Sequence, residues 1–419
     1  MAGVLVGAPT FGQLSDLFGR KWVLVIAWTL NILFGIGSSF SPNWIVFSVL
    51  RFFIGFFIGG MISIWAVYSM ELITQRHRVW IFGLMGWPPA YILFAWVAYL
   101  SQDWRTLSWV VSVATVPALI LLILFAHESP LWLMSKSKQA QAIRVVTKIN
   151  NWSCRTVNQQ ELNTVIRQSI LASISTSSKK YTFWHLFYTW KMAKCTVVLA
   201  LAWFTTSGVS YGLLFNAGRL AGSIYINITY YGAMRWVIGW VVGASDLLLK
   251  CCGRKILHNL CVGIIGVACA AVFVLTVFEL DQSQEELVRY LNLVAAVSTS
   301  PVWIVIYLLS AELYPTPVRN LANSFHSLFA RLGGVLAPQV LYMSNFWSPA
   351  MYLIFTLWLA LDWILFLVII PETKGQPLPE QMPEQSQRIG FRRSSAHKRS
   401  SGTERSNSFN VYKFTSVNS

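Results

Sequence analysis

Hydrophobic blocks of about 20 residues recur along the 419-residue chain and decide what it can fold into. A helix of that length spans roughly 30 Å of hydrocarbon, whereas a spanning strand needs only about ten residues of alternating polarity. Because backbone groups inside a bilayer must bond to one another, we expect the blocks to be transmembrane helices. The composition agrees, with 55% hydrophobic and 11% charged residues, against roughly 25% charged in soluble domains.

Eleven spans follow from these blocks, and the segments that connect them differ in charge. The predicted spans are residues 1–14, 22–40, 44–69, 79–100, 107–125, 196–216, 223–249, 256–278, 289–310, 321–343 and 349–370. Lys and Arg gather in connectors 15–21, 70–78, 126–195, 250–255 and 311–320. The positive-inside rule places those connectors in the cytosol. The net charge of +16 is therefore a topology signal, and no nucleic-acid partner is expected.

One long polar connector divides the chain into two halves. We expect an all-α membrane protein with an N-terminal bundle of about five spans, a cytosolic linker, a six-helix C-terminal bundle and a basic cytosolic tail. The corresponding ranges are 1–125, 126–195, 196–370 and 371–419. The tail has serines beside basic residues that a kinase could recognise, namely Ser394, Ser395, Ser400 and Ser401. No structural disulfide is expected, because none of the six cysteines falls in a predicted external segment.

The two halves repeat each other at three landmarks. The string SMEL containing Glu71 matches SAEL containing Glu312, and an arginine follows each glutamate seven residues later, as Arg78 and Arg319. The string GRK recurs after residues 18 and 252, and ESP at 128–130 corresponds to PET at 371–373. Three landmarks in register indicate a duplicated unit, which is typical of transporters.

These motifs resemble those of a known family. The string GQLSDLFGRK at 12–21 is similar to the cytosolic loop between the second and third spans of the major facilitator superfamily. ESPLWLMSK at 128–136, AELYPTPVRN at 311–320 and PETKGQPLPE at 371–380 look like the organic cation, organic anion and carnitine transporters of that superfamily. The resemblance implies two six-helix bundles, with this chain beginning inside the second span, so that the first span is missing.

The resemblance also implies roles for residues in these loops. Gly12 would let two helices approach, and Asp16, Gly19, Arg20 and Lys21 would order the inner surface. In the alternating-access mechanism of such carriers, Asp16, Glu71, Glu312 and Arg319 would hold an inner gate. In the second half Lys250 takes the place of the acid, which argues against a matching ion pair there.

Two arginines lie in the middle of predicted spans, Arg235 in 223–249 and Arg331 in 321–343. Each costs about 2.5–3.5 kcal/mol on insertion scales unless it faces a partner or water. In the resembling family, cation carriers have an acid where Arg331 stands and anion carriers have an arginine, and most relatives have an acid where Arg235 stands. The resemblance therefore favours anionic substrates. The alternative is a structural ion pair between Arg331 and Asp362.

Other candidate residues carry weaker signals. The aromatic residues Phe204, Tyr211 and Trp303 stand where the resembling carriers place aromatic side chains around flat organic ions, although packing is the more common role of such residues. Arg51 precedes Gly55 and Gly59, whose spacing favours helix packing, and structural charge pairing is favoured for Arg51 itself.

The histidines show no metal-ligand spacing, and the chain has no phosphate-binding loop or catalytic constellation. We therefore expect no metal, cofactor or enzymatic activity. The predicted function is movement of small organic ions, anions favoured, across the cell membrane. The alternative is a membrane protein that does not transport and instead acts as a receptor or regulates full-length copies.

Overall fold

The computed structural model describes residues 2–72, 87–152, 164, 166–167, 182–220, 222–248, 253–374 and 382. Arg78, Lys250 and the four tail serines lie outside these ranges. The described regular structure is helical, with no strand in those ranges. Seven of its segments are long and apolar enough to cross a membrane by length and composition.

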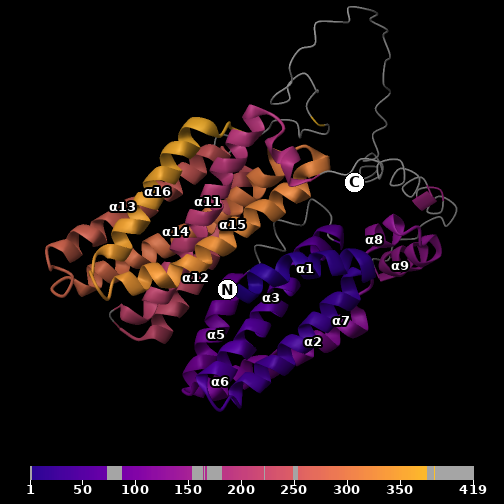
Figure 1. The fold of residues 1–419 in the computed structure, drawn as a ribbon, viewed down its shortest axis with the longest axis horizontal. Coiled ribbons are helices and arrows are strands. Elements are labelled where there is room, and N and C mark those ends of the chain that lie inside the picture. Colours follow the sequence, from indigo (N-terminus) through magenta and orange to yellow (C-terminus); the bar gives the residue numbers. More distant parts are fainter. Residues whose placement is uncertain are drawn as a thin grey trace, which may run out of the picture.

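Residues before the linker form one bundle, shown in indigo and violet in Figure 1. Its helices are α1 (Ala2–Phe18), α2 (Arg20–Ser39), α3 (Trp44–Leu72), α5 (Trp87–Ser101), α6 (Trp104–Ala114) and α7 (Val116–Phe125), followed by the short α8 (Pro130–Ser135) and α9 (Gln139–Trp152). The predicted span 107–125 is split at Thr115. Pro117 explains the position of the break, because a proline is tolerated in the first turn of a helix but not in its interior.

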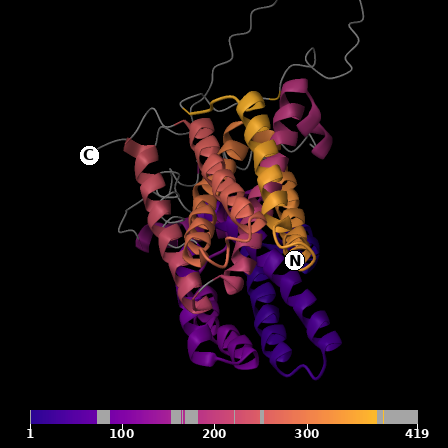
Figure 2. The same ribbon diagram turned by 90° about the vertical axis from the view of Figure 1, so that its left-hand side faces the viewer.

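Residues after the linker form the second bundle, shown from magenta to yellow in Figure 1 and from another side in Figure 2. It consists of η1 (Phe183–Phe187), α11 (Trp190–Asn216), η2 (Ala217–Arg219), α12 (Ile224–Leu248), α13 (Arg254–Val277), α14 (Glu285–Glu312), α15 (Thr316–Met343) and α16 (Ala350–Ile369). Each of the eleven predicted spans thus overlaps a helix or, for 107–125, a pair of helices. Of span 79–100, residues 79–86 lie outside the described ranges.

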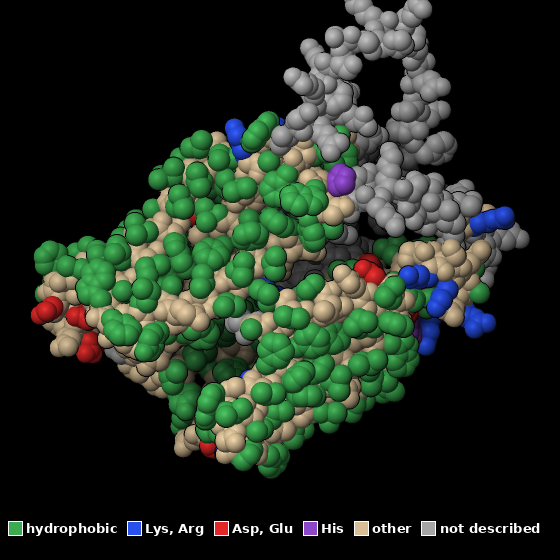
Figure 3. Space-filling model, viewed as in Figure 1, with side chains coloured by type: hydrophobic (Ala, Val, Ile, Leu, Met, Phe, Trp, Pro, Cys, Tyr) green, Lys and Arg blue, Asp and Glu red, His purple; other side chains and the backbone are tan. Residues whose placement is uncertain are grey.

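Glycines let helices touch backbone to backbone in both bundles. A Cβ on Gly7 of α1 would lie 1.9 Å from the carbonyl oxygen of Phe56 in α3, and one on Gly333 of α15 would lie 2.2 Å from that of Phe204 in α11. Small residues at such contacts are typical of membrane helices, where close packing replaces the hydrophobic effect. Hydrophobic side chains cover most of both bundles on the face shown in Figure 3, as a lipid environment requires.

Candidate transport site and charged end

A carboxylate holds the beginning of α2 in place. The backbone N–H groups of Arg20 and Lys21 donate to Glu128 Oε1 over 2.8 and 3.1 Å. Gly19 makes this possible, since its φ is +113° and a Cβ there would lie 2.6 Å from Glu128 Oε2. The Arg20 guanidinium reaches Asp16 at 2.6 Å and Glu71 at 3.4 Å. Three motifs of the first half therefore meet at one place.

The second half repeats this arrangement at the beginning of α13. Glu372 accepts from the N–H groups of Arg254 at 2.8 Å and Lys255 at 3.1 Å. A Cβ on Gly253 would lie 2.1 Å from Glu372 Oε2, and Arg254 Nε lies 3.5 Å from Glu312. The pair of Arg254 with Glu312 repeats that of Arg20 with Glu71. Lys250 lies outside the described residues, so the expectation that it leaves no counterpart of the Arg20–Asp16 pair stays a prediction.

The charge of Glu372 is set by its neighbours. Partial burial acts to raise the pKa of Glu372, but backbone N–H donors from Lys374, Arg254, Lys255 and Thr373 outweigh it and lower the pKa. Donors at a helix start stabilise the carboxylate form, because the helix dipole adds to the hydrogen bonds. The two motif clusters around Arg20 and Arg254 are called the charged end below.

The other loop residues predicted from the motifs are placed as follows. Lys21 Nζ donates to the carbonyl of Ile123 at 2.9 Å, and Arg319 donates to the carbonyl of Tyr314 at 3.4 Å. A Cβ on Gly12 would meet no described atom within 4 Å, so Gly12 is not a close-approach glycine in this part of the structure. Arg51 lies exposed over the ring of Phe47. No described carboxylate pairs with it.

Arg235 is buried in the middle of α12, with 8% of its surface exposed. Its guanidinium donates to the hydroxyls of Tyr231 and, at 3.4 Å, Ser210, and it lies over the Tyr231 ring. Tyr91 of α5 packs edge-on against Tyr231, with ring centroids 5.2 Å apart. The surroundings of Arg235 therefore include side chains from both bundles, although no carboxylate in the described ranges lies within ion-pair distance.

Arg331 lies half-buried on α15, and its Nε has no hydrogen-bond partner among the described residues. Tyr307 of α14 is close enough to interact electrostatically with both Arg331 and Tyr211. Tyr91 is an electrostatic neighbour of both Tyr211 and Arg235. Electrostatic neighbours thus run from Arg235 through Tyr91, Tyr211 and Tyr307 to Arg331, and these five residues are called the wall below.

The predicted aromatic residues pack into this wall or beside it. Trp303 packs edge-on against Trp203, with centroids 5.6 Å apart, and the ring of Phe204 lies 4.9 Å from that of Trp358. Tyr211 lies against Gly334 of the neighbouring α15. Sequence reasoning missed Tyr91, Tyr231 and Tyr307, because aromatic residues make up 15% of the chain and do not stand out.

Asp362 does not pair with Arg331, contrary to the alternative considered from the sequence. Its Oδ2 lies 3.7 Å from His258 Nε2 of α13, and both residues are 0% exposed. Nothing in the sequence marks His258, because the histidines show no metal-ligand spacing. Within the described residues no group of three or more His, Cys, Asp or Glu side chains could hold a metal ion.

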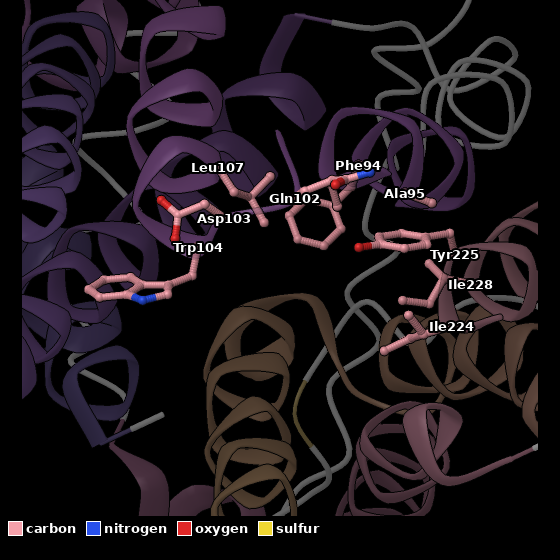
Figure 4. Close-up of a pocket in the computed structure, with 10 residues that line it drawn as sticks. Phe94, Ala95, Gln102, Asp103, Trp104, Leu107, Ile224, Tyr225 and Ile228 are labelled. Carbon is pink, nitrogen blue, oxygen red and sulfur yellow. The ribbon is translucent and has the colours of Figure 1, made fainter. Parts of the chain in front are cut away.

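The two bundles meet through α5 and α12. Tyr99 and Tyr225 pack edge-on across this contact at 5.5 Å, and a pocket of about 270 Å³ lies beside it. Figure 4 shows Phe94 and Ala95 of α5 facing Tyr225 and Ile228 of α12 there. At the charged end the ion pairs of the described residues join helices of the same bundle. Figure 3 shows a hollow between the bundles.

A family model described as "Sugar (and other) transporter" matches residues 1–384. The chain belongs to this transporter family. It is 27% identical to an organic cation transporter-like protein of Drosophila melanogaster, over 92% of this chain and 68% of that protein. It is 30% identical to human solute carrier family 22 member 16, over 90% of this chain but only 64% of the relative. The predicted membership of the organic-ion branch of the major facilitator superfamily is confirmed.

Solved structures show the same fold. An inward-open conformation of the xylose transporter XylE from E. coli superposes with a TM-score of 0.69, covering 89% of this chain and 85% of that one, at 18% identity. A sugar-bound structure of that protein, described as a proton:xylose symporter, gives 0.65 at 18% identity. The all-α major facilitator fold that the motif resemblance implied is therefore confirmed, and this family member is a multi-pass membrane protein.

Proposed function

We propose that this chain carries small organic anions across the plasma membrane by alternating access. The observation that supports this is the wall around Arg235 and Arg331, two guanidiniums without a described carboxylate partner. A guanidinium can bind a carboxylate through two parallel hydrogen bonds. Tyr91, Tyr211 and Tyr307 add hydroxyl groups and flat ring surfaces, so the fitting substrate class is an aromatic or otherwise flat carboxylate.

The names of the relatives favour the opposite charge, because two Drosophila proteins are named for organic cations. We favour anions because a cation would have to bind beside two positive charges, one buried and one half-buried, with no described acid paired with either. Like charges at such a depth repel strongly, since the surroundings screen them poorly. The sign of the substrate is thus the part of the proposal that an experiment can decide first.

Alternating access would use the two bundles as units that rock about the site. We propose that the charged end faces the cytosol, because the connectors rich in Lys and Arg lie at that end, and that the segment after Ile369 is cytosolic for the same reason. In the arrangement described here, the ion pairs of each motif cluster at the charged end stay within one bundle. Arg20 pairs with Asp16 and Glu71, and Arg254 pairs with Glu312. We propose that these clusters and Arg319 contact the other bundle when the cytosolic side closes.

Uptake by the purified full chain in proteoliposomes tests the proposal. Benzoate and benzyltrimethylammonium serve as probes, because both are flat aromatic ions but differ in charge. We expect uptake of benzoate, loss of that uptake in Arg331→Asp and Arg235→Gln, and no loss in Arg219→Gln. Arg219 is the matched control, since it is exposed and bonds to Ser344 and Asn345 far from the wall.

Three results would contradict parts of the proposal. Uptake of the cation alone would overturn the choice of anions, and unchanged benzoate uptake in Arg331→Asp would remove Arg331 from the site. No uptake of either ion, by protein that elutes as one species, would favour the non-transporting alternative.

A further inference from the structure

Two ionisable side chains are fully enclosed in the C-terminal bundle, away from the two arginines. His258 of α13 and Asp362 of α16 are both 0% exposed, and Nε2 and Oδ2 lie 3.7 Å apart. Both carboxyl oxygens and both ring nitrogens are buried without a hydrogen-bond partner in the described ranges. Thr205 of α11 faces the carboxyl group, but its hydroxyl donates to the carbonyl of Ala202.

The charge balance of such a pair requires one proton. A single ionised carboxylate without partners in an apolar interior is strongly destabilised. With one proton the pair is neutral overall, either as imidazole beside a carboxylic acid or as imidazolium beside a carboxylate. Without it, one uncompensated negative charge stays buried.

The pair lies between the aromatic wall and the charged end. On α13, His258 is one helical turn after Arg254, which bonds to Glu312. On α16, Asp362 is one turn after Trp358, whose ring packs against Phe204. A change in charge at the pair therefore acts on α13, which carries Arg254 of the charged end, and on α16, whose Trp358 packs against Phe204 of α11.

Other titratable or charged groups on the surrounding helices do not pair with it. On α11 they are Lys191 and Lys194, which are exposed in the first turn, with Cys195 and Tyr211; on α13, Arg254, Lys255, Cys261 and Cys269; on α14, Glu285, Glu286, Arg289, Tyr290, Tyr307 and Glu312; and on α15, Arg319, His326, Arg331 and Tyr342. His326 is occupied by Ser310 and Tyr314. The one ion-pair contact of either His258 or Asp362 in the described structure is with the other.

We propose that His258 and Asp362 form a proton-binding site whose occupancy biases the carrier toward the arrangement described here. The pair is sealed in this arrangement, so releasing the proton leaves a buried charge that a rearranged bundle could hydrate. By linkage, the proton then stabilises the sealed arrangement, and raising the pH populates the other. The conformational part of this inference rests on the proposed function, whereas proton binding does not.

Infrared difference spectroscopy of the full chain in nanodiscs, between about pH 5 and 8, tests the binding site directly. We expect a band of a protonated carboxyl group, or an imidazole band, that changes over this range and is lost in Asp362→Asn and altered in His258→Gln. Asp103→Asn is the matched control, because asparagine can still cap α6. No change in the wild type, or the same change in Asp362→Asn, would overturn the proposal.

A distance measurement between spin labels tests the bias. Labels at Leu17 of α1 and Ile256 of α13, in a background without the six native cysteines, report the separation of the bundles at the charged end; both positions are more than half exposed. We expect the longer distance between the labels to dominate in acid. As the pH rises, the ratio of the longer-distance to the shorter-distance population should fall by at most about tenfold per pH unit, since one proton is involved.

The spin-label result separates the two proposals. The proposed bias would be overturned if the distance distribution of the wild type did not change with pH, or if that of Asp362→Asn still changed with pH. Absence of benzoate uptake with an intact infrared signal would count against the proposed function and leave the proton site standing.

Discussion

Gly19 and Gly12 belong to one motif, but the structure predicts opposite effects for alanine at the two positions. Gly19 joins α1 to α2 with φ +113° and ψ 153°, and an added Cβ would lie 2.6 Å from Glu128 Oε2. Gly12 lies inside α1, where an added Cβ would meet no described atom within 4 Å. The pair therefore tests whether the contacts, rather than the motif, decide the role of each glycine.

The expected loss for Gly19→Ala has two parts. A residue other than glycine in that backbone region costs about 1–3 kcal/mol. Moving the Glu128 carboxylate away weakens its hydrogen bonds to the N–H groups of Arg20 and Lys21, which compares with losing a helix cap at about 1 kcal/mol. The sum is about 2–4 kcal/mol. Gly12→Ala should instead gain up to about 1 kcal/mol, because alanine is the better helix former.

Thermal melting of the full chain in nanodiscs at one fixed scan rate measures the difference. One kcal/mol shifts the melting temperature by about 2–4 °C in domains of 150–250 residues. We therefore expect Gly19→Ala to melt several degrees below the wild type, and Gly12→Ala at or slightly above it. Equal melting temperatures for the two variants would refute the account of the Glu128 contact.

Two further predictions use the same measurement. Gly333→Ala should lower the melting temperature by several degrees, because its Cβ would lie 2.2 Å from the carbonyl oxygen of Phe204, whereas Gly239→Ala, with no described atom within 4 Å, should not; equal effects would contradict the backbone contact. Glu372→Gln should cost about 1–2 kcal/mol at neutral pH. Since the folded state lowers the pKa of Glu372, its stabilisation is complete above about pH 4.3 and lost as the pH falls through the lower folded value. The melting temperatures of the wild type and Glu372→Gln should converge only in acid. A difference that persists there would contradict a stabilising role of the ionised Glu372 carboxylate.

The spans and the repeat were predictable because each can be recognised from short stretches of consecutive residues. A block of about 20 apolar residues needs no partner to be recognised. The strings around Arg20 and Arg254 recur with their glutamates in the same order, so their common geometry follows once the halves are known to be duplicated. The role of Glu128 and Glu372 as helix caps could not be predicted from the sequence. Each glutamate contacts a helix start that lies more than 100 residues earlier in the chain, as in the 108-residue separation of Arg20 and Glu128.

The wall and the buried pair were harder to predict for a different reason. Tyr91 gains its significance from Tyr231 in the other bundle, and nothing in its own segment marks it among so many aromatic residues. Asp362 was noticed as an acid in an apolar span, and His258 is the one histidine of α13. The sequence does not say which of several helices an isolated charge will face. Arg331 was therefore only an alternative partner for Asp362, and the neighbour in the structure is His258.

The charge of the C-terminal bundle links the proton site to the anion site. With its proton, the pair of His258 and Asp362 contributes no net charge, and Arg235 and Arg331 leave the interior of the C-terminal bundle with two positive charges. Loss of the proton adds a negative charge to the same bundle, which weakens the attraction for an anion. A carboxylate in the wall in turn makes the proton bind more tightly, because coupling between two sites is reciprocal. Proton and anion would therefore favour each other whatever the structural change between arrangements, and a carrier that took cations through this wall would need the opposite coupling.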